Sequence, residues 1–384
     1  MTDTFIPYGR HFLDSSDIAA VDEVLRSDWL TTGSKVDVFE SAVADYVGAD
    51  YGVAVSSGTA ALHCALVAAG VGDEDEVLMP ALTFVADASM VALSGARPVL
   101  ADVKHEDLLI DVNAVADKIS PRTKALIAVD YAGQPCDYIF LRRFADRHNL
   151  CLIADACHAL GSSQDGRKVG SLADMTVFSF HPVKHITTGE GGMVVTDKAE
   201  FAEKIRKFRN HGISVDHQQR AQRATWEYDV ETFAFNYRLT DFQCALGLSQ
   251  LKKLPIWLVR RREIARRYDL AFKNSPYLKP LHVNDAGGHA YHLYVVRLNL
   301  EVLSIDKAEI FKRLRQAGIG VNVHYKPLNL MTVMQRKYGY LAGDFPVAEK
   351  AYEEILSLPI YPAMQDEDVQ KVADSCLHIL SSVK

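Results

Sequence analysis

The chain has 384 residues, 48% hydrophobic and 24% charged, which is typical of a folded globular protein long enough for two domains. Its net charge of −7 argues against a nucleic-acid-binding protein, because such proteins present a basic surface. We find neither a signal-peptide core at the N-terminus nor an apolar run near the roughly 20 residues of a membrane helix. The six cysteines form no Cys-x-x-Cys pair, which predicts reduced, buried thiols in a cytoplasmic protein.

Short β-rich runs alternate with helical segments between about residue 50 and residue 200. This alternation predicts a mostly parallel sheet with helices on both faces, and ligands bind such sheets at the carboxyl ends of the strands. Helices are expected at 59–69, 83–94 and 138–148. Strands are expected at 51–56, 76–79, 97–102, 124–129, 151–155, 175–180 and 192–196.

The pattern changes near residue 250. Pro255 is expected to open a long charged helix at 256–273. A strand near 291–298 and helices near 307–317 and 366–381 follow. We therefore predict an α/β protein with a large domain over residues 1–250 and a smaller α+β domain over residues 251–384.

A small-residue motif, SSGTAAL, stands at 56–62, where a strand gives way to a helix. Gly58 lets the backbone approach an anion, the N–H groups of a helix N-terminus bind phosphate, and Thr59 adds a hydroxyl. The alternative is an ordinary strand-to-helix turn with a Ser/Thr cap.

Asp155 is the last residue of an apolar strand in the motif IADACHALG at 153–161. At the ligand-binding edge of the sheet, its carboxylate can hold a cationic ring nitrogen such as the protonated pyridine of pyridoxal 5'-phosphate (PLP). The alternatives are a helix N-cap for Asp155 and a hydrogen-bonded core histidine for His158.

Lys184 lies on a loop after the next strand, in SFHPVKHITTGEGG at 179–192. A partly desolvated lysine near a cationic ring has a lowered pKa, which suits imine formation. The alternative is a solvated loop lysine. His181 and His185 are four residues apart, but Pro182 disfavours a helix there, so no metal site is expected.

These three motifs project to one edge of one sheet and together predict a PLP enzyme with Lys184 as the Schiff-base lysine. With LTTG at 30–33, RNHG at 209–212 and NYRLTD at 236–241, they resemble the DegT/DnrJ/EryC1/StrS aminotransferases. The resemblance covers essentially the whole chain. It implies a fold-type I PLP aminotransferase for nucleotide-linked keto-sugars, with PLP bound by the large domain.

The resemblance also implies roles for single residues. Asp155 would pair with the pyridine nitrogen, Phe84 would stack on the pyridine face, and His158 would be a second cofactor contact. Asn236 would reach the phosphate from the neighbouring subunit of a homodimer with shared active sites; its alternative role is to cap the helix that begins near Thr240. The phosphate cup would comprise Gly58, Thr59, Ala60 and Ser179.

Two positions depart from the family pattern. Cys157 stands where many relatives have alanine, and His185 stands where some relatives have a small residue or proline. Both changes bear on the shape of the cofactor pocket and on substrate identity rather than on the chemistry.

Within the family, VDYAG at 129–133, ALGLSQLKK at 245–253 and VHYKPL at 323–328 resemble the aminotransferases of the pseudaminic-acid pathway. This implies amination at C4 of a UDP-linked 4-keto-6-deoxy-N-acetyl sugar. L-Glutamate would be the donor, with pyridoxamine 5'-phosphate (PMP) as the intermediate cofactor form.

Substrate contacts are expected from a few polar and basic residues. His324 and Tyr325 would contact the sugar, or else pack within the small domain. Arg209, Arg238 and Lys326 would hold the diphosphate, or else be solvated or paired with acids.

Four alternative functions compete with this one, and the last three are disfavoured because the sequence lacks the feature that each would carry. The aminotransferase could take a dTDP- or GDP-linked sugar. A sugar dehydratase of the same fold would carry histidine in place of Lys184. A PLP-binding sensor would carry a DNA-binding domain, and an NAD-dependent oxidoreductase would show Gly-x-Gly-x-x-Gly after its first strand.

Overall fold

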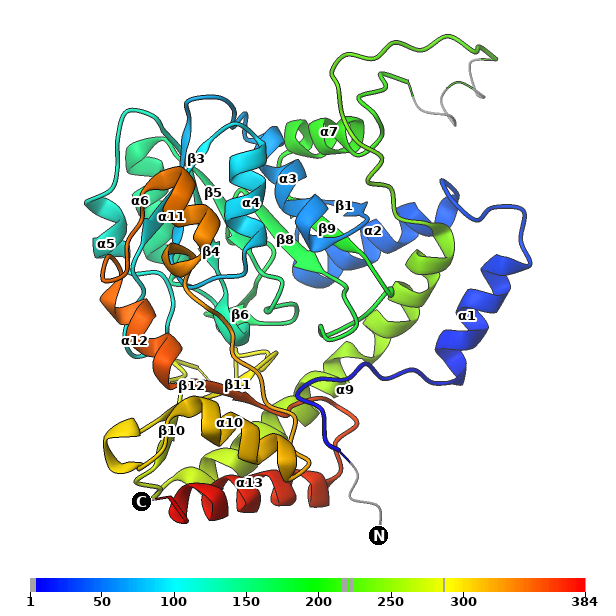
Figure 1. The fold of residues 1–384 in the computed structure, drawn as a ribbon. Helices are drawn as coiled ribbons and strands as arrows, with labels where there is room; N and C mark the ends of the chain where they lie inside the picture. The colour runs from blue at the N-terminus through cyan, green and yellow to red at the C-terminus, as the bar shows by residue number, and fades with distance from the viewer. Residues whose placement is uncertain (1–4, 216–219, 221–223, 286, 384) are drawn as a thin grey trace.

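The computed structural model describes residues 5–215, 220, 224–285 and 287–383. Its large unit is built on a seven-stranded sheet of order β1-β9-β8-β5-β4-β2-β3 (Figure 1). Only β9 runs antiparallel to its neighbours, so the prediction of a mostly parallel sheet is confirmed. The strands are β1 Tyr51–Val55, β2 Glu76–Pro80, β3 Arg97–Ala101, β4 Thr123–Val129, β5 Cys151–Asp155, β8 Met175–Ser179 and β9 Gly192–Thr196, with a hairpin of β6 Ser163–Gln164 and β7 Arg167–Lys168.

Successive residues of the strands point to opposite faces of this sheet, so their side chains pack into two different hydrophobic cores. On β1, Val53 and Val55 join the core that contains α3, whereas Ala54 joins the core that contains α2. Because both faces are buried, the strands read as almost continuous apolar runs. The helices of this unit are α1 Ser15–Leu25, α2 Ser34–Val47, α3 Gly58–Ala68, α4 Ala86–Leu93, α5 Val112–Ala116, α6 Tyr138–His148 and α7 Ala199–Phe208.

A smaller α+β unit lies below the large sheet in Figure 1. Its three-stranded antiparallel sheet packs with α10, α13 and the second half of α9 around residues such as Tyr268 and Leu314. The bounds are α9 Asp241–Phe272, β10 Leu278–Pro280, β11 Tyr294–Leu298, α10 Lys307–Gln316, α11 Thr332–Tyr338, α12 Pro346–Glu354, β12 Ile355–Leu358 and α13 Asp366–Ser381. The division at residues 250 and 251 stays a prediction, since α9 runs continuously across it.

The chain returns from the small unit to the large one through α11 and α12, drawn in orange in Figure 1. This segment lies against β3, an edge strand of the large sheet. The Tyr340 hydroxyl accepts from the Leu100 N–H at 3.0 Å and donates to the Pro98 carbonyl at 3.1 Å. The Val347 N–H donates to Asp102 at 3.0 Å. A late segment of the chain therefore covers an edge formed by early residues.

The prediction that Pro255 opens a helix is wrong, because α9 begins at Asp241 and passes through this proline. Proline removes one helical hydrogen bond, but Pro255 lies on the exposed face, where water can satisfy the freed carbonyl. On the opposite face Leu251, Leu254 and Leu258 are buried in the core beneath the sheet. This packing on both sides of the proline keeps the helix continuous.

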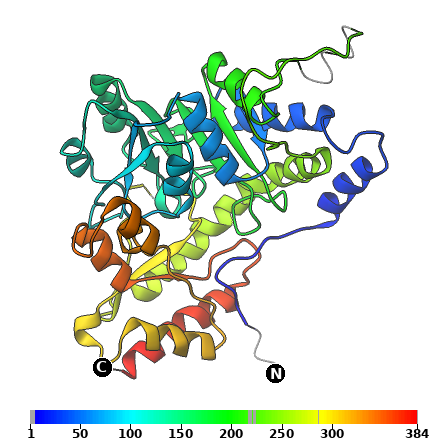
Figure 2. The same cartoon turned by 45° about the horizontal axis from the view of Figure 1, so that its top comes forward.

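The N-terminal segment runs between the two units before α1, as Figure 2 shows. Ile6 forms a bridge with Ile319, and the Ile360 N–H donates to the Tyr8 carbonyl at 3.1 Å. These contacts carry Tyr8 to the edge of the large sheet where the strands end. None of the helices in the described ranges combines the length and apolarity needed to cross a bilayer.

Candidate active site

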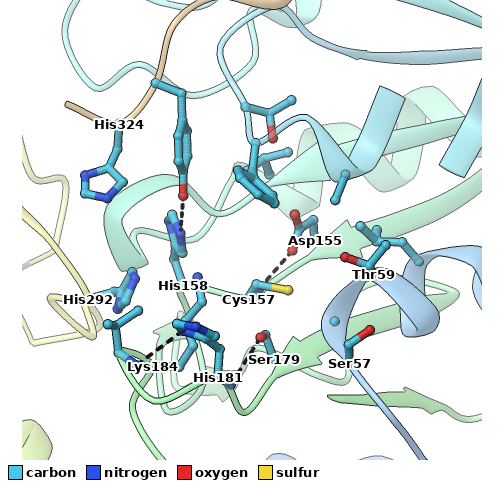
Figure 3. Close-up of a pocket in the computed structure, with 18 of the residues that line it drawn as sticks. Ser57, Thr59, Asp155, Cys157, His158, Ser179, His181, Lys184, His292 and His324 are labelled. Atoms are coloured by element: carbon cyan, nitrogen blue, oxygen red, sulfur yellow. Dashed lines mark hydrogen bonds between the residues drawn. The ribbon is translucent and has the colours of Figure 1, made fainter. Parts of the chain in front are cut away.

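A cavity of about 470 Å³ opens at the carboxyl ends of β1, β5 and β8, where the small unit meets the sheet (Figure 3). Each strand contributes a polar residue just where it ends, as expected for a mostly parallel sheet. The structure therefore brings together most of the predicted site residues. These are Gly58, Thr59, Phe84, Asp155, His158, Ser179, Lys184, His324 and Tyr325.

The start of α3 forms one end of the cavity. Ser57 caps the helix, its hydroxyl accepting from the Ala60 N–H at 3.0 Å. Ala60 is buried and does not line the cavity. A Cβ on Gly58 would come within 2.9 Å of Ser179 Cβ, so glycine lets the end of β8 lie against the helix. Helix N–H groups and the hydroxyls of Ser57, Thr59 and Ser179 thus converge where an anion would bind.

Asp155 lies in the cavity wall, 7% exposed, and accepts from the Cys157 N–H at 3.0 Å. Behind it Asp87 is fully buried and accepts from the Thr83 hydroxyl at 2.5 Å. Burial, and then the Asp155 carboxylate, raise the pKa of Asp87 well above its usual value. A carboxylate at this depth requires a cation or a donor as partner, which a protonated ring nitrogen provides.

Lys184 follows a tight turn after β8, its N–H donating to the His181 carbonyl at 2.8 Å. Its side chain enters the cavity rather than solvent. Burial lowers the pKa of Lys184, while the nearby Cys157 and Asp155 oppose this effect. A lowered pKa increases the share of neutral amine, which is the form that attacks a carbonyl.

His158, Tyr325 and Phe84 form the wall between these groups and the small unit. Tyr325 Oη lies 2.9 Å from His158 Nε2, and the Tyr325 ring lies 5.7 Å from that of Phe84. Burial, with Lys184 next, lowers the pKa of His158 well below its usual value. His158 Nδ1 is buried and has no partner among the described residues. Phe84 is 53% exposed, which leaves a ring face for stacking.

His324 belongs both to the cavity and to the packing of the small unit. Its Nδ1 lies 2.8 Å from the Ser357 hydroxyl, and its carbonyl accepts from the Tyr131 hydroxyl. Several other lining residues were missed by the sequence analysis, among them Tyr8, Asn322 and His292. Tyr8, whose ring lies 5.4 Å from that of His324, gave no local signal, because only the path of the N-terminal segment brings it here.

Arg238 and Asn236 lie outside this cavity. Arg238 lines a second cavity, also of about 470 Å³, and donates to Asn210 at 2.6 Å. Asn236 is exposed and forms a bridge with Asn210. Lys326 is exposed and does not line the first cavity.

Arg209 also lines the second cavity but is already paired. It donates to the buried Glu40 carboxylate and, at 2.6 Å, to the Ala54 carbonyl. Arg209 is therefore paired with an acid, which is the alternative to its expected role as a diphosphate ligand. Within the described chain, the lining of the first cavity contains no arginine.

The residues of the first cavity fit PLP. The start of α3 offers N–H groups and hydroxyls for a phosphate, Asp155 offers a carboxylate, and Lys184 offers an amine of lowered pKa. The buried His158 Nδ1 has no hydrogen-bond partner among the described residues and is available to a bound cofactor. No group of three or more His, Cys, Asp or Glu side chains is placed as metal ligands would be in the ranges described.

A model of the DegT/DnrJ/EryC1/StrS aminotransferase family matches residues 12–377. The chain belongs to this family. It is 40% identical over 378 residues to the Bacillus subtilis spore coat polysaccharide biosynthesis protein SpsC, covering 98% of this chain and 97% of SpsC.

Two solved structures of the family superpose closely on this fold. Helicobacter pylori PseC, an aminotransferase involved in the biosynthesis of pseudoaminic acid, gives a TM-score of 0.91 at 36% identity, covering 99% of this chain and 100% of PseC. The PMP form of Streptococcus pneumoniae Spr1654 gives a TM-score of 0.92 at 32% identity, covering 99% and 100%. Spr1654 was also solved in a PLP form. The protein is a PLP-dependent sugar aminotransferase.

Proposed function

We propose that the enzyme transfers an amino group from L-glutamate to C4 of a UDP-linked 4-keto-6-deoxy-N-acetyl sugar. The observation that carries its amino-transfer chemistry is the joint placement of Lys184, Asp155 and the start of α3 around one cavity. The likeness to PseC over 99% of the chain supports a substrate of the pseudaminic-acid type. A dTDP- or GDP-linked keto-sugar is the second candidate. The chain is about as similar in sequence to SpsC, a spore coat polysaccharide biosynthesis protein, as it is to PseC, so sequence identity does not single out the PseC pathway.

Each residue of the cavity has a distinct task in this proposal. Bound PLP supplies a cationic ring that withdraws electrons from the reacting carbon. Asp155 keeps the ring nitrogen protonated, and the α3 N-terminus with Ser179 holds the phosphate. Phe84 stacks on the ring and His158 fixes its orientation. Lys184 first holds the cofactor and then, once released, carries a proton to and from the substrate carbon.

We propose that two copies of the chain complete each other's sites. The described part of the segment between α7 and α9 projects from the body (Figure 1) and carries Trp226 and Phe233, which are 84% and 98% exposed. Large apolar side chains at such exposure indicate an interface. Asn236 and Arg238 lie at the base of this segment, so docking would bring them to the partner's cavity. Arg238 would then supply a cation for the diphosphate.

Mixing two inactive variants tests this sharing. Lys184→Ala subunits exchanged with Asn236→Ala subunits are expected to regain up to about a quarter of wild-type activity. The assay uses a PLP concentration low enough that loss of the Asn236 contact leaves the site without cofactor. Half of the dimers are then mixed, and each mixed dimer has one intact site. The measurement is specific activity after subunit exchange, with mixed dimers verified by mass spectrometry.

The control for this mixture is Lys184→Ala with Asp155→Asn. Both residues belong to the same subunit's cavity, so no mixed dimer has an intact site and no recovery is expected. Mixed Lys184–Asn236 dimers without recovery would mean that each site is complete within one chain.

The sugar is tested by direct competition. We expect kcat/KM for a UDP-linked N-acetylated 4-keto-6-deoxy sugar to exceed that for a dTDP-linked analogue without the acetamido group by about 10- to 100-fold. A site built with placed polar groups, here Tyr8, His324 and Tyr325, rejects analogues that leave those groups unpaired. Amine transfer from L-glutamate is followed by release of 2-oxoglutarate. A preference for the dTDP sugar would refute the UDP assignment and leave the aminotransferase chemistry intact.

We propose a cytoplasmic location for the enzyme. All six cysteines are free thiols in the structure, and four of them are buried. A compartment that keeps thiols reduced is compatible with this arrangement.

A further inference from the structure

An unassigned histidine lies beside Lys184. His292 precedes β11 and lines the cavity together with Lys184. Its ring packs against that of His158 with the centroids 4.3 Å apart, and against that of His185 at 5.5 Å. Figure 3 shows His292 and His158 on the Lys184 side of the cavity, away from Thr59.

The backbone of His292 is fixed by contacts from two separate elements. Arg261 of α9, which is buried, donates to the carbonyls of Tyr291 at 3.0 Å and His292 at 3.5 Å. Gly133, with φ +103°, allows close approach, since a Cβ there would lie 3.1 Å from His292 N. Tyr291 is held at φ +48°, a left-handed conformation that a non-glycine residue keeps only where its surroundings impose it.

The imidazole of His292 is uncharged, and one of its nitrogens has no hydrogen-bond partner among the described residues. Burial lowers its pKa well below the usual value, and electrostatic repulsion from its basic neighbours His158, Lys184, His185 and Arg261 acts in the same direction. A neutral imidazole has one donor and one acceptor nitrogen. His292 Nδ1 is buried and has no hydrogen-bond partner in the part of the chain that is described.

We propose that His292 is a positioning residue for Lys184, accepting one N–H of the lysine amine when that amine is released from the bound cofactor during turnover. This inference rests on the proposed role of Lys184. An amine has two N–H groups and one lone pair, so fixing one N–H directs the lone pair. Lys184 takes the proton of the substrate carbon through that lone pair, and its direction therefore affects the rate of proton transfer rather than substrate affinity.

Two variants at this position separate the role from mere packing. His292→Leu fills the space without an acceptor, whereas the side-chain oxygen of His292→Asn supplies one. We expect His292→Leu to lower kcat by about 10- to 100-fold, with KM for both substrates and Kd for PLP changed by less than about twofold. His292→Asn should recover most of the lost kcat. Thermal unfolding of both variants in the PLP-loaded form checks that they are folded.

A measurement on the wild-type protein gives an answer even if His292→Leu does not fold. ¹⁵N-histidine spectra are compared between the PLP form, where Lys184 is covalently held, and the PMP form, where its amine is free. One imidazole resonance, absent from His292→Asn, is expected to shift between the two forms.

Three results would overturn the inference: a kcat of His292→Leu within about twofold of wild type, equal losses in the two variants, or an unshifted His292 resonance. Borohydride labelling keeps this failure apart from that of the proposed function. If Lys184 carries the label and His292→Leu is fully active, only the role of His292 falls. If another lysine carries the label, the proposed role of Lys184 fails with it.

Discussion

Lys184→Ala is expected to abolish turnover, lowering kcat by at least about a thousandfold. On the roles proposed for Lys184, the variant would lose both the group that binds the cofactor covalently and the base that moves the substrate proton. The anion cradle at α3 and the carboxylate of Asp155 are unchanged, so PLP should still bind, but without a covalent bond. Borohydride reduction followed by peptide mass spectrometry should attach the cofactor to Lys184 in the wild type and to no lysine in the variant.

A matched control for this experiment is Lys273→Ala. Lys273 is exposed at the end of α9, remote from the cavity lining, and its removal should leave kcat and labelling unchanged. The assignment of Lys184 would be wrong if reduction fixed the cofactor on a different lysine, or if Lys184→Ala retained more than a few per cent of wild-type turnover.

Asp155→Asn is expected to lower kcat by about a thousandfold or more, equivalent to several kcal/mol of transition-state stabilisation. A neutral amide cannot hold a protonated ring nitrogen, so a bound cofactor would withdraw electrons less strongly when the substrate proton is removed. The amide keeps the size of the carboxylate and its bond from the Cys157 N–H, so the fold should persist. Single-turnover kinetics and the visible spectrum of the bound cofactor measure the two effects separately.

Asp165→Asn is the control for the chemical change itself. Asp165 is exposed in the turn between β6 and β7 at φ +50°, a left-handed conformation that asparagine also tolerates. We expect it to leave activity unchanged. Near-normal activity in Asp155→Asn would rule out the pairing of Asp155 with the ring nitrogen.

The sequence predicted the sheet well because both faces of its strands are buried, which makes each strand a short apolar run bounded by turn residues. It also predicted that Asp155, Ser179 and Lys184 lie together, because Asp155 and Ser179 end strands and Lys184 lies on the loop that follows β8. In a largely parallel sheet, the carboxyl ends converge at one edge without any knowledge of the loops.

What the sequence did not predict depends on contacts between distant segments. Tyr8 and His292 reach the cavity through the path of the N-terminal segment and the clamp by Arg261, neither of which has a local pattern. Arginine is a common phosphate ligand, but Arg209 pairs with Glu40 instead. Glu40 lies 169 positions away in the chain, so no local pattern indicates this pairing. Pro255 suggested a helix start, because proline is common in the first turn of helices. That local rule does not include the packing that holds α9 together on both sides of the proline.

The cover that α11 and α12 place over β3 bears on synthesis at the ribosome. An unpaired edge strand is a template for pairing with other chains, and β3 stays such an edge until Tyr340 and the residues after it have emerged. Domains commonly fold in order as they are made, N-terminal part first. Here the large unit reaches its protected state only after nearly the whole polypeptide has been translated, so the nascent chain passes through a long interval in which aggregation through this edge competes with folding.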